Sequence, residues 1–196
     1  MGRWQPGAQE RLRRAALDLF GEQGFDATSV AQITERAGVT ERTFFRHFAD
    51  KREVLFAGEG EFEQPFLDAV ADAPAGTGHL DLVAAALDAA CAAFEAWRTR
   101  DEARARQRIL DAHAGLRERE LLKLDHLACS LAGALRERGA TALRARLAGD
   151  LAVSVFVAAF TRWTAEDAAG DGPGLRELAR EALAQVRDLV VAPPSA

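Results

Sequence analysis

Apolar residues recur at steps of three and four along almost the whole chain, which is the spacing of one face of an α-helix. No segment shows the strict alternation of a half-buried strand. We therefore expect an all-α protein. The predicted helices, about nine in number, cover residues 8–25, 29–38, 41–48, 51–62, 80–99, 101–112, 115–139, 142–166 and 175–191. Pro65 is expected to kink or interrupt the fourth of them.

Between residues 28 and 41 the helical pattern is interrupted in a particular order. Thr28 or Ser29 can cap the second helix, and Gln32, three residues after Ser29, completes a capping box. Gly38 ends that short helix, because glycine takes a left-handed backbone without steric cost. Thr40 then caps the third helix. Two short helices joined by a glycine-containing turn are typical of a helix-turn-helix.

The third helix combines phenylalanines with polar side chains. Phe44 and Phe48 are four residues apart, so we expect both to point inward and to dock this helix on the first two. The polar side chains then face outward, toward a DNA groove; they are Arg42, Thr43, Arg46 and His47.

The stretch "LDLFGEQGFDATSVAQITERAGVTERTFFRHFADKREVL" closely resembles the DNA-binding domain of the tetracycline-repressor (TetR) family of bacterial transcription regulators, over about residues 10–56. The resemblance implies nine or ten helices, a homodimer and a larger C-terminal domain that binds a small molecule. We therefore expect a DNA-binding domain at 1–56 and a ligand-binding and dimerisation domain at 57–196. Ala49 stands where many members have proline, and Phe45 where many have a tyrosine hydroxyl that could bond a phosphate.

DNA affinity should come from phosphate contacts and specificity from contacts with base edges. Lys51, Thr28 and Thr40 stand at predicted helix starts, which favour phosphate, and His47 is similar to the family's phosphate-contacting histidine. Arginine can bond guanine and the threonine methyl can touch thymine, so residues 42 and 43 are candidates for base contacts. The predicted DNA-binding set is Thr28, Thr40, Glu41, Arg42, Thr43, Phe45, Arg46, His47 and Lys51.

Three of these roles have alternatives. Glu41 is equally a candidate cap of its own helix, Arg46 is a candidate for either a base or a phosphate contact, and the alternative for His47 is a surface residue that packs on Phe44. Arg3 could enter the minor groove as a basic arm, or belong to an unstructured tail.

Two C-terminal segments, "RILDAHAGLRERELLKLDHLACSLAGALRERG" and "FTRWTAEDAAGDGPGLRELAREAL", look like a TetR subgroup described as binding acyl-CoA-like ligands. A ligand pocket between helices would be mostly apolar with a few polar groups. The candidate ligand-binding residues are Phe94, Trp97, His113, Phe156, Phe160 and Trp163, with His126 as a further polar candidate. Plain core is the alternative for the aromatic residues. Phosphates of such a ligand would need cations, for which Arg98, Arg100, Arg104, Arg106 and Arg108 are candidates, the alternative being a solvated face.

The last two predicted helices carry more apolar positions than one core needs, so we expect them to form a dimer seam. The residues concerned are Leu147, Leu151, Val155, Ala158, Leu178, Leu183, Val186 and Leu189, with small residues at Ala152, Ala159 and Ala182. The alternative is that all of them belong to the core of one chain.

Composition and charge narrow the function classes. The chain has 196 residues, of which 48% are hydrophobic and 28% charged, as in a globular protein with a core. Residues 1–57 carry nine Lys/Arg and eight Asp/Glu, whereas the remainder carries sixteen and twenty-two, so the first part is slightly basic and the rest acidic. The longest near-continuous apolar run, Leu151 to Phe160, is too short to span a bilayer. No secretion signal is evident, and we expect a cytoplasmic protein.

Two isolated cysteines, Cys91 and Cys129, indicate neither a disulfide framework nor a zinc site. The sequence has no GxSxG, no HExxH and no phosphate-cradling glycine loop, so we expect neither an enzyme nor a cofactor. The predicted function is a ligand-responsive transcription regulator, namely a homodimeric repressor that binds a pseudo-palindromic double-stranded DNA operator. It is expected to leave the operator when it binds a small apolar or acyl-type effector. The subgroup resemblance implies an acyl-CoA-like effector. Activation, or a helical adaptor that does not bind DNA, are the alternatives.

Overall fold

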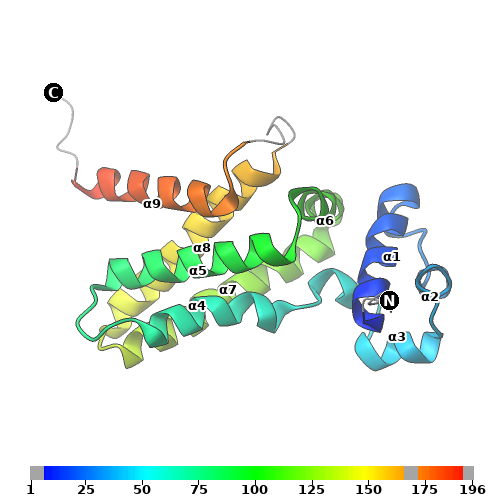
Figure 1. Cartoon of the computed structure of the whole chain (residues 1–196), viewed down its shortest axis with the longest axis horizontal. Helices are drawn as coiled ribbons and strands as arrows, with labels where there is room; N and C mark the ends of the chain where they lie inside the picture. Colours follow the sequence, from blue (N-terminus) through cyan, green and yellow to red (C-terminus); the bar gives the residue numbers. More distant parts are fainter. Residues whose placement is uncertain (1–6, 166–171, 192–196) are drawn as a thin grey trace, which may run out of the picture. The chain divides into compact units, whose positions relative to one another are not determined.

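The computed structural model describes residues 7–165 and 172–191, and over this range it is all-α (Figure 1). The predicted fold class and the number of helices are confirmed. The elements are α1 (Ala8–Gln23), α2 (Val30–Ala37), α3 (Glu41–His47), a 3-10 turn η1 (Glu53–Phe56), α4 (Glu59–Asp72), α5 (His79–Trp97), α6 (Arg100–Ala112), α7 (Ala114–Glu137), α8 (Ala142–Thr164) and α9 (Leu175–Val191). Arg3 lies outside the described residues.

The fourth helix differs from the prediction. It does not begin at Lys51, where residues 53–56 form a single 3-10 turn instead, and the Asp50 carboxylate accepts the backbone N–H groups of Arg52 and Glu53, at 2.7 and 3.1 Å. Gly58, with a φ of 85°, separates this turn from α4. Helix α4 then continues through Pro65, so the predicted interruption is wrong.

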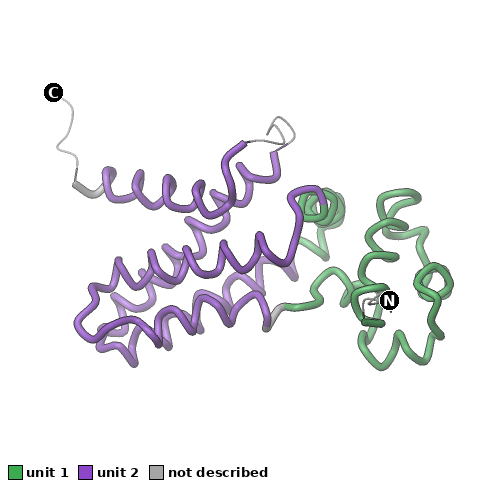
Figure 2. The backbone as a smooth tube through the Cα atoms, in the orientation of Figure 1, with its two compact units in different colours: residues 1–59, 102–117 green, residues 60–101, 118–196 purple. Residues whose placement is uncertain are grey.

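The chain divides into two compact units, coloured in Figure 2. Unit 1 comprises residues 1–59 and 102–117, and unit 2 comprises 60–101 and 118–196. The sequence had suggested domains at 1–56 and 57–196, whereas the contact units also place residues 102–117 with the first segment. Most of α6 and the first residues of α7 belong to unit 1, because Ile109 and Leu110 of α6 and Leu116 of α7 are buried in the same core as residues of α1, α2 and α3.

The core of unit 1 also contains a charged side chain. Arg13 is 4% exposed, and its guanidinium donates to Glu10 of its own helix, at 2.5 and 2.8 Å, and to Glu102 of α6 at 3.4 Å. Burial lowers the pKa of Arg13, but its bonds to the two carboxylates more than offset this and raise it overall. The pattern of α1 alone could not show that α6 covers this face.

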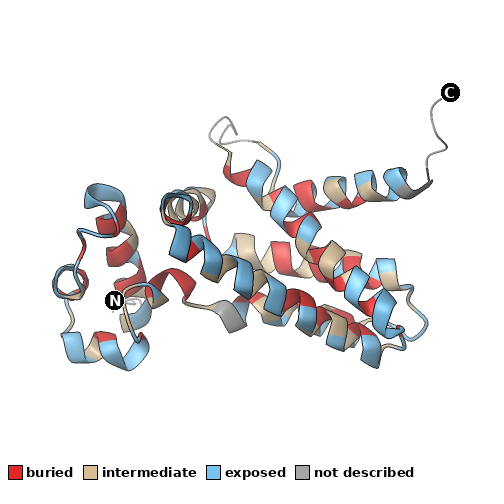
Figure 3. Cartoon of the chain, turned by 180° about the vertical axis from the view of Figure 1, so that it is seen from behind, coloured by how far each residue is buried: buried red, intermediate tan, exposed pale blue. Residues whose placement is uncertain are grey.

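In unit 2, helix α5 packs on both α8 and α9, and α8 also packs on α9 (Figure 1). Along each helix the buried residues form a stripe and the exposed residues the opposite face (Figure 3). Helices α7 and α8 approach closely at Gly149, where an added Cβ would lie 2.4 Å from the Ala128 carbonyl oxygen. Among the described residues no helix is both long and apolar enough to cross a membrane.

A row of acids joins α5 to α9. Asp88 accepts hydrogen bonds from Arg176 and pairs with Arg180, and Asp81 accepts from Arg187 at 3.2 Å. At the other end of α5 the Glu95 carboxylate accepts the backbone N–H of Leu175, at 2.6 Å, and so caps α9. The acids follow one another at intervals of seven residues, which keeps them on one face of α5.

Both cysteines are free thiols. Cys91 is buried, and this burial raises its pKa to about 12, which keeps it protonated at neutral pH. Cys129 is exposed, and the Arg146 guanidinium donates to its sulfur at 3.2 Å.

Candidate DNA interface

The start of α2 has the capping box predicted from the sequence. The Ser29 hydroxyl accepts the backbone N–H of Gln32 at 3.2 Å, and the Gln32 side-chain oxygen accepts the backbone N–H of Ser29 at 2.9 Å. Two N–H groups that the helix leaves without a partner are satisfied in this way. The inner face of α2 is anchored by Ile33, which is fully buried.

The turn between α2 and α3 depends on Gly38. Its backbone is left-handed, with φ 65° and ψ 40°, and its N–H donates to the Glu35 carbonyl at 3.1 Å. The next N–H, that of Val39, donates to the Thr34 carbonyl at 3.0 Å, and the Val39 side chain packs on the core. The Thr40 hydroxyl then accepts the N–H of Thr43, at 3.2 Å, and starts α3.

Helix α3 has one face in the core and one in solvent. Phe44 is fully buried and Phe48 is 5% exposed, and their ring centres are 5.4 Å apart. Each buried phenylalanine contributes about 1.5–3 kcal/mol to holding the helix in place. The outward side chains are exposed, except Thr43, which is half-buried; they are Thr40, Glu41, Arg42, Thr43, Phe45, Arg46 and His47. This is one continuous surface over eight residues of sequence.

Phe45 is the apolar member of this surface. It is 56% exposed, and its ring meets Phe44 edge to face at 5.4 Å. His47 is exposed as well, and its ring lies 6.2 Å from that of Phe48.

Thr28 does not present the hydroxyl that we predicted for phosphate binding. Its side chain is 2% exposed, and the hydroxyl donates to the Gly24 carbonyl at 2.8 Å. The hydroxyl also accepts the side-chain amide of Gln23 at 3.2 Å. Ser29, one residue later, caps α2 instead, so the side chain of Thr28 closes the turn between α1 and α2 from inside.

Lys51 likewise has its ammonium turned into the protein. Its Nζ donates to three backbone carbonyls of the α1–α2 turn, those of Phe25 (2.7 Å), Asp26 (3.2 Å) and Thr28 (2.9 Å), and lies 4.5 Å from the centre of the Phe25 ring. An ammonium has three protons, so this set uses all of them. Lys51 is also not at a helix start. In place of the predicted phosphate contact, its ammonium therefore binds and stabilises the turn that precedes α2.

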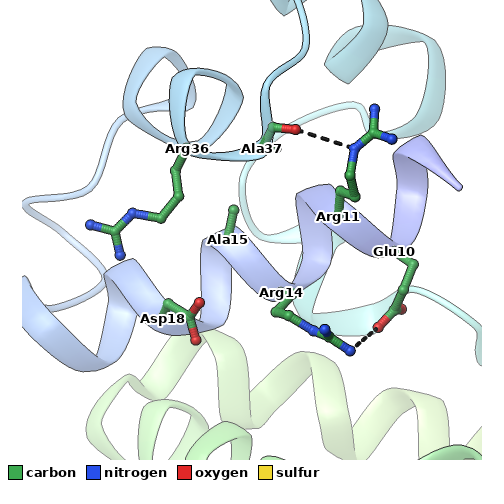
Figure 4. A pocket seen from close by; sticks show the side chains of 7 residues that line it. All are labelled: Glu10, Arg11, Arg14, Ala15, Asp18, Arg36 and Ala37. Atoms are coloured by element: carbon green, nitrogen blue, oxygen red, sulfur yellow. Dashed lines mark hydrogen bonds and ion pairs between the residues drawn. The ribbon is translucent and has the colours of Figure 1, made fainter. Parts of the chain in front are cut away.

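Polar side chains of α1 and α2 stabilise the helix-turn-helix through bonds between these two helices. Arg11 donates its Nε to the Ala37 carbonyl at 3.2 Å, which satisfies the C-terminal end of α2 (Figure 4). Arg36 bonds both Glu22 carboxylate oxygens, at 2.6 and 2.8 Å. A hollow of about 190 Å³ lies between these helices, with Arg14 and Asp18 also in its lining.

The structure of unit 2 brings together four of the six predicted ligand-binding residues. The ring centres of Phe94, Phe156, Phe160 and Trp163 lie within 5.6–6.4 Å of their neighbours in this set. Trp97 is 38% exposed, and the Arg98 guanidinium lies 3.9 Å from the centre of its ring.

His113 belongs to unit 1 instead, where its ring packs 5.1 Å from that of Phe25. Phe62 and Phe66 of α4 also join the aromatic cluster, 5.1 and 6.0 Å from Phe156, and were not predicted. The four-residue spacing of Phe62 and Phe66 places both rings on one face of their helix. The sequence did not show which other helices that face contacts.

The predicted dimer seam is partly internal. Val155, Leu178 and Leu183 are at most 5% exposed and belong to the core of the chain. The remaining predicted positions with exposed side chains are Leu147 (59%), Leu189 (81%) and Ala158, and Leu143 (70%) and Val157 (39%) on α8 are exposed as well.

The helix-turn-helix region of the chain is similar to a known protein family. Residues 12–57 match the model for bacterial regulatory proteins of the tetR family. Over 81 residues the chain is 42% identical to the HTH-type transcriptional regulator TcmR of Streptomyces glaucescens, a match that covers 41% of this chain and 36% of TcmR. The chain thus matches about a third of the length of this curated relative.

Solved structures extend the similarity to the whole fold. FadR of Bacillus subtilis in complex with stearoyl-CoA is similar with a TM-score of 0.64 and 20% identity, over 94% of this chain and 98% of that one. The SmeT–triclosan complex is similar with a TM-score of 0.65 and 21% identity, over 96% of both chains.

Proposed function

We propose that the chain is a transcriptional regulator of the TetR family that binds double-stranded operator DNA through α3, because residues 12–57 match the model for bacterial regulatory proteins of the tetR family. The observation that carries this proposal is the surface of α3. Residues 40–43 and 45–47, polar or charged except Phe45, form the outer side of a helix that Phe44 and Phe48 anchor to the core. Such a helix can enter the major groove with its N-terminal residues toward the base edges.

Roles on the surface follow from position and chemistry. Arg42 and Thr43 lie in the first turn of α3, so Arg42 would bond guanine and the Thr43 methyl would touch thymine. Glu41 would accept from cytosine, and Arg46 and His47, in the last turn, would bond phosphates together with Thr40. Phe45 would contribute apolar contact without the hydroxyl of a tyrosine.

A single helix of this size makes few contacts, so operator binding calls for a homodimer. Two copies of α3 about 34–36 Å apart would read the two halves of a pseudo-palindromic operator. The exposed apolar side chains of α8 and α9 support a seam between copies, since such residues on a helix face favour burial against a partner.

The regulating signal would be a small molecule held in unit 2. The aromatic cluster of α4, α5 and α8 supports an apolar ligand, and solved structures of this fold hold stearoyl-CoA in FadR and triclosan in SmeT. An acyl-CoA would need cations for its phosphates. Arg98 instead stacks on Trp97, Arg100 donates to the Pro173 carbonyl at 2.6 Å and Arg106 donates to the Leu55 carbonyl at 2.7 Å, which favours an apolar effector. Release of DNA requires that the effector prefer one arrangement of the dimer, and a hundredfold loss of affinity corresponds to about 2.7 kcal/mol of coupling.

A binding titration with operator variants tests this proposal. DNA flanking the protein's own gene is used in a mobility-shift assay, and Arg42→Ala is compared with Arg144→Ala, which removes an exposed arginine of α8. Arg42→Ala should flatten the base preference at one position of each half-site, at a cost of about 1–3 kcal/mol, whereas Arg144→Ala should bind as the unmodified protein does. Equal behaviour of the two variants would contradict the proposed orientation of α3.

A further inference from the structure

Phe45 is an apolar side chain on a surface that is otherwise polar. It is 56% exposed, and among the described residues of unit 1 it is the one large apolar side chain that is exposed. The side chains around it on the outer side of α3 are charged: Glu41 and Arg42 lie one turn before it, and Arg46 follows it. All three are exposed. The part of the Phe45 ring that meets solvent is therefore available to a partner.

The exposed ring of Phe45 is supported from the core side. It meets the Phe44 ring edge to face, with the ring centres 5.4 Å apart and the ring planes at 81°. Phe44 is fully buried, so it does not move away when Phe45 is contacted. Because the Phe45 ring is already packed on one side, it loses little side-chain freedom when an apolar group packs on the other side.

The size of this apolar area decides which partner it fits. A stable interface with another protein buries on the order of 800 Å² per partner, which a single ring among charged side chains does not supply. The exposed cations beside the ring, Arg42 and Arg46, favour the phosphates of a nucleic acid. In the major groove of DNA, which α3 is proposed to enter, the apolar group on the base edges is the methyl on C5 of thymine. One methyl group is the size of partner that one ring can cover.

We propose that Phe45 recognises the methyl group on C5 of a pyrimidine in the operator, which is present in thymine and in 5-methylcytosine. The inference rests on the proposed function and names the base feature that Phe45 selects. Phe45 and Arg42 are three residues apart on α3, so their Cβ atoms lie about 5–6 Å apart. Since the bases of one strand stack about 3.4 Å apart, the methyl is expected within two base pairs of the guanine assigned to Arg42.

Thr43 is the other side chain of α3 to which a methyl contact is assigned. It precedes Phe45 by two residues, which places the two side chains on nearly opposite sides of the helix. Its hydroxyl lies 3.1 Å from that of Thr40, at the start of α3. Thr43 and Phe45 therefore contact different base pairs, and their contributions can be separated by position along the operator.

Deoxyuracil in place of thymine removes only the C5 methyl, and so it tests the proposal on the full-length protein. Operator DNA identified by the mobility-shift assay is made with one thymine of each half-site replaced at a time, and each affinity is measured at fixed salt. At one position the replacement should weaken binding about fourfold per half-site, which is the contribution of one buried methyl group. At that position Phe45→Ala should bind both duplexes alike, whereas Thr43→Ser should keep the difference. With cytosine placed there, methylation on C5 should strengthen binding by a similar factor.

Two further variants separate recognition of the methyl from general loss of binding. His47→Ala removes another exposed side chain of α3 and should weaken binding to both duplexes by the same factor. Phe45→Leu keeps an apolar side chain and should retain part of the difference. Far-ultraviolet circular dichroism should show that both Phe45 variants are folded, because the position is exposed.

The proposal is overturned if no thymine replacement weakens binding, or if Phe45→Ala keeps the full difference at every sensitive position. Methylation of the cytosine without any effect on affinity would overturn it as well. Operator binding that is indifferent to the methyl contradicts this inference alone, whereas a protein that binds none of the duplexes contradicts the proposed function itself.

Discussion

At the scale of single residues, the structure separates exposed side chains, which are free to meet a partner such as DNA, from side chains of the same kind that stabilise the fold. Arg42 and Arg46 are exposed on α3, whereas Arg13 is 4% exposed and paired with two glutamates. Lys51 donates to three carbonyls and so is fully engaged inside unit 1. A positive charge near a helix-turn-helix is therefore not by itself a phosphate ligand, because buried carbonyls compete for the same protons.

Lys51→Met tests this distinction. We expect it to lower the free energy of unfolding by about 1–3 kcal/mol, because three backbone carbonyls lose a charged donor. The slope of log affinity for DNA against log salt should stay the same, since no phosphate contact is removed. Chemical denaturation and a salt series of binding titrations measure the two quantities. Arg52→Met, one residue further along, is the control, because it also removes one positive charge, but from an exposed side chain. A fall of about one unit in the salt slope for Lys51→Met would restore the phosphate role.

At the scale of elements, α5 and α9 are held together by charges in addition to their apolar faces. Asp88 bonds Arg176 and Arg180 of α9, and the hydrogen bond from Arg176 is the main cause that lowers the pKa of the Asp88 carboxyl below its ordinary value of 3.8. A carboxyl with a lowered pKa in the folded state stabilises the protein above its unfolded pKa and loses that contribution as the pH falls.

The pH dependence of Asp88→Asn follows from this sign. At neutral pH the variant should lose roughly 1 kcal/mol of unfolding free energy, a small value because the pair is partly exposed. The difference between variant and unmodified protein should start to shrink below about pH 4, the ordinary pKa of an aspartate, and should disappear as the pH falls through the lowered pKa of folded Asp88. Denaturant titrations at pH 7, 5 and 3.5 measure it. A difference that stays constant over this range would contradict a charge-based role.

The elements also show why the boundaries of short segments are hard to predict. The sequence after Phe48 has good helix formers, yet residues 53–56 form a 3-10 turn and the α-helix begins only at Glu59. Both outcomes satisfy the same apolar pattern, since Val54, Leu55 and Phe56 are buried in either case. The end of α2 was predictable, because Gly38 has a positive φ that other residues rarely adopt.

At the scale of the whole molecule, the apolar side chains of α8 and α9 fall into two groups. Part of it, including Leu178 and Leu183, is core, and part, including Leu147 and Leu189, remains exposed. Only the exposed part is available to a second copy of the chain.

Leu147→Glu combined with Leu189→Glu tests the proposed seam. Both positions are exposed in one chain, so the helical content should not change, but the dimer should dissociate because charges would face each other across it. Sedimentation velocity should show a monomer, and operator affinity should fall at least about tenfold. Leu121→Glu, at a 67% exposed position of α7 outside the seam, should leave the dimer intact. A double variant that remains dimeric would place the seam elsewhere.

Local features of the sequence alone determined the all-α class, most helix ends and the solvent-facing side of α3, because caps, glycines and helical periodicity act between residues a few positions apart. The tertiary structure decided what depends on residues far apart in the chain. Helix α6 covers α1 and buries Arg13, the carbonyls of residues 25, 26 and 28 take the ammonium of Lys51, and α4 contributes Phe62 and Phe66 to the aromatic cluster. The apolar pattern predicts that a helix face is buried, whereas the packing of the chain determines which other residues cover that face.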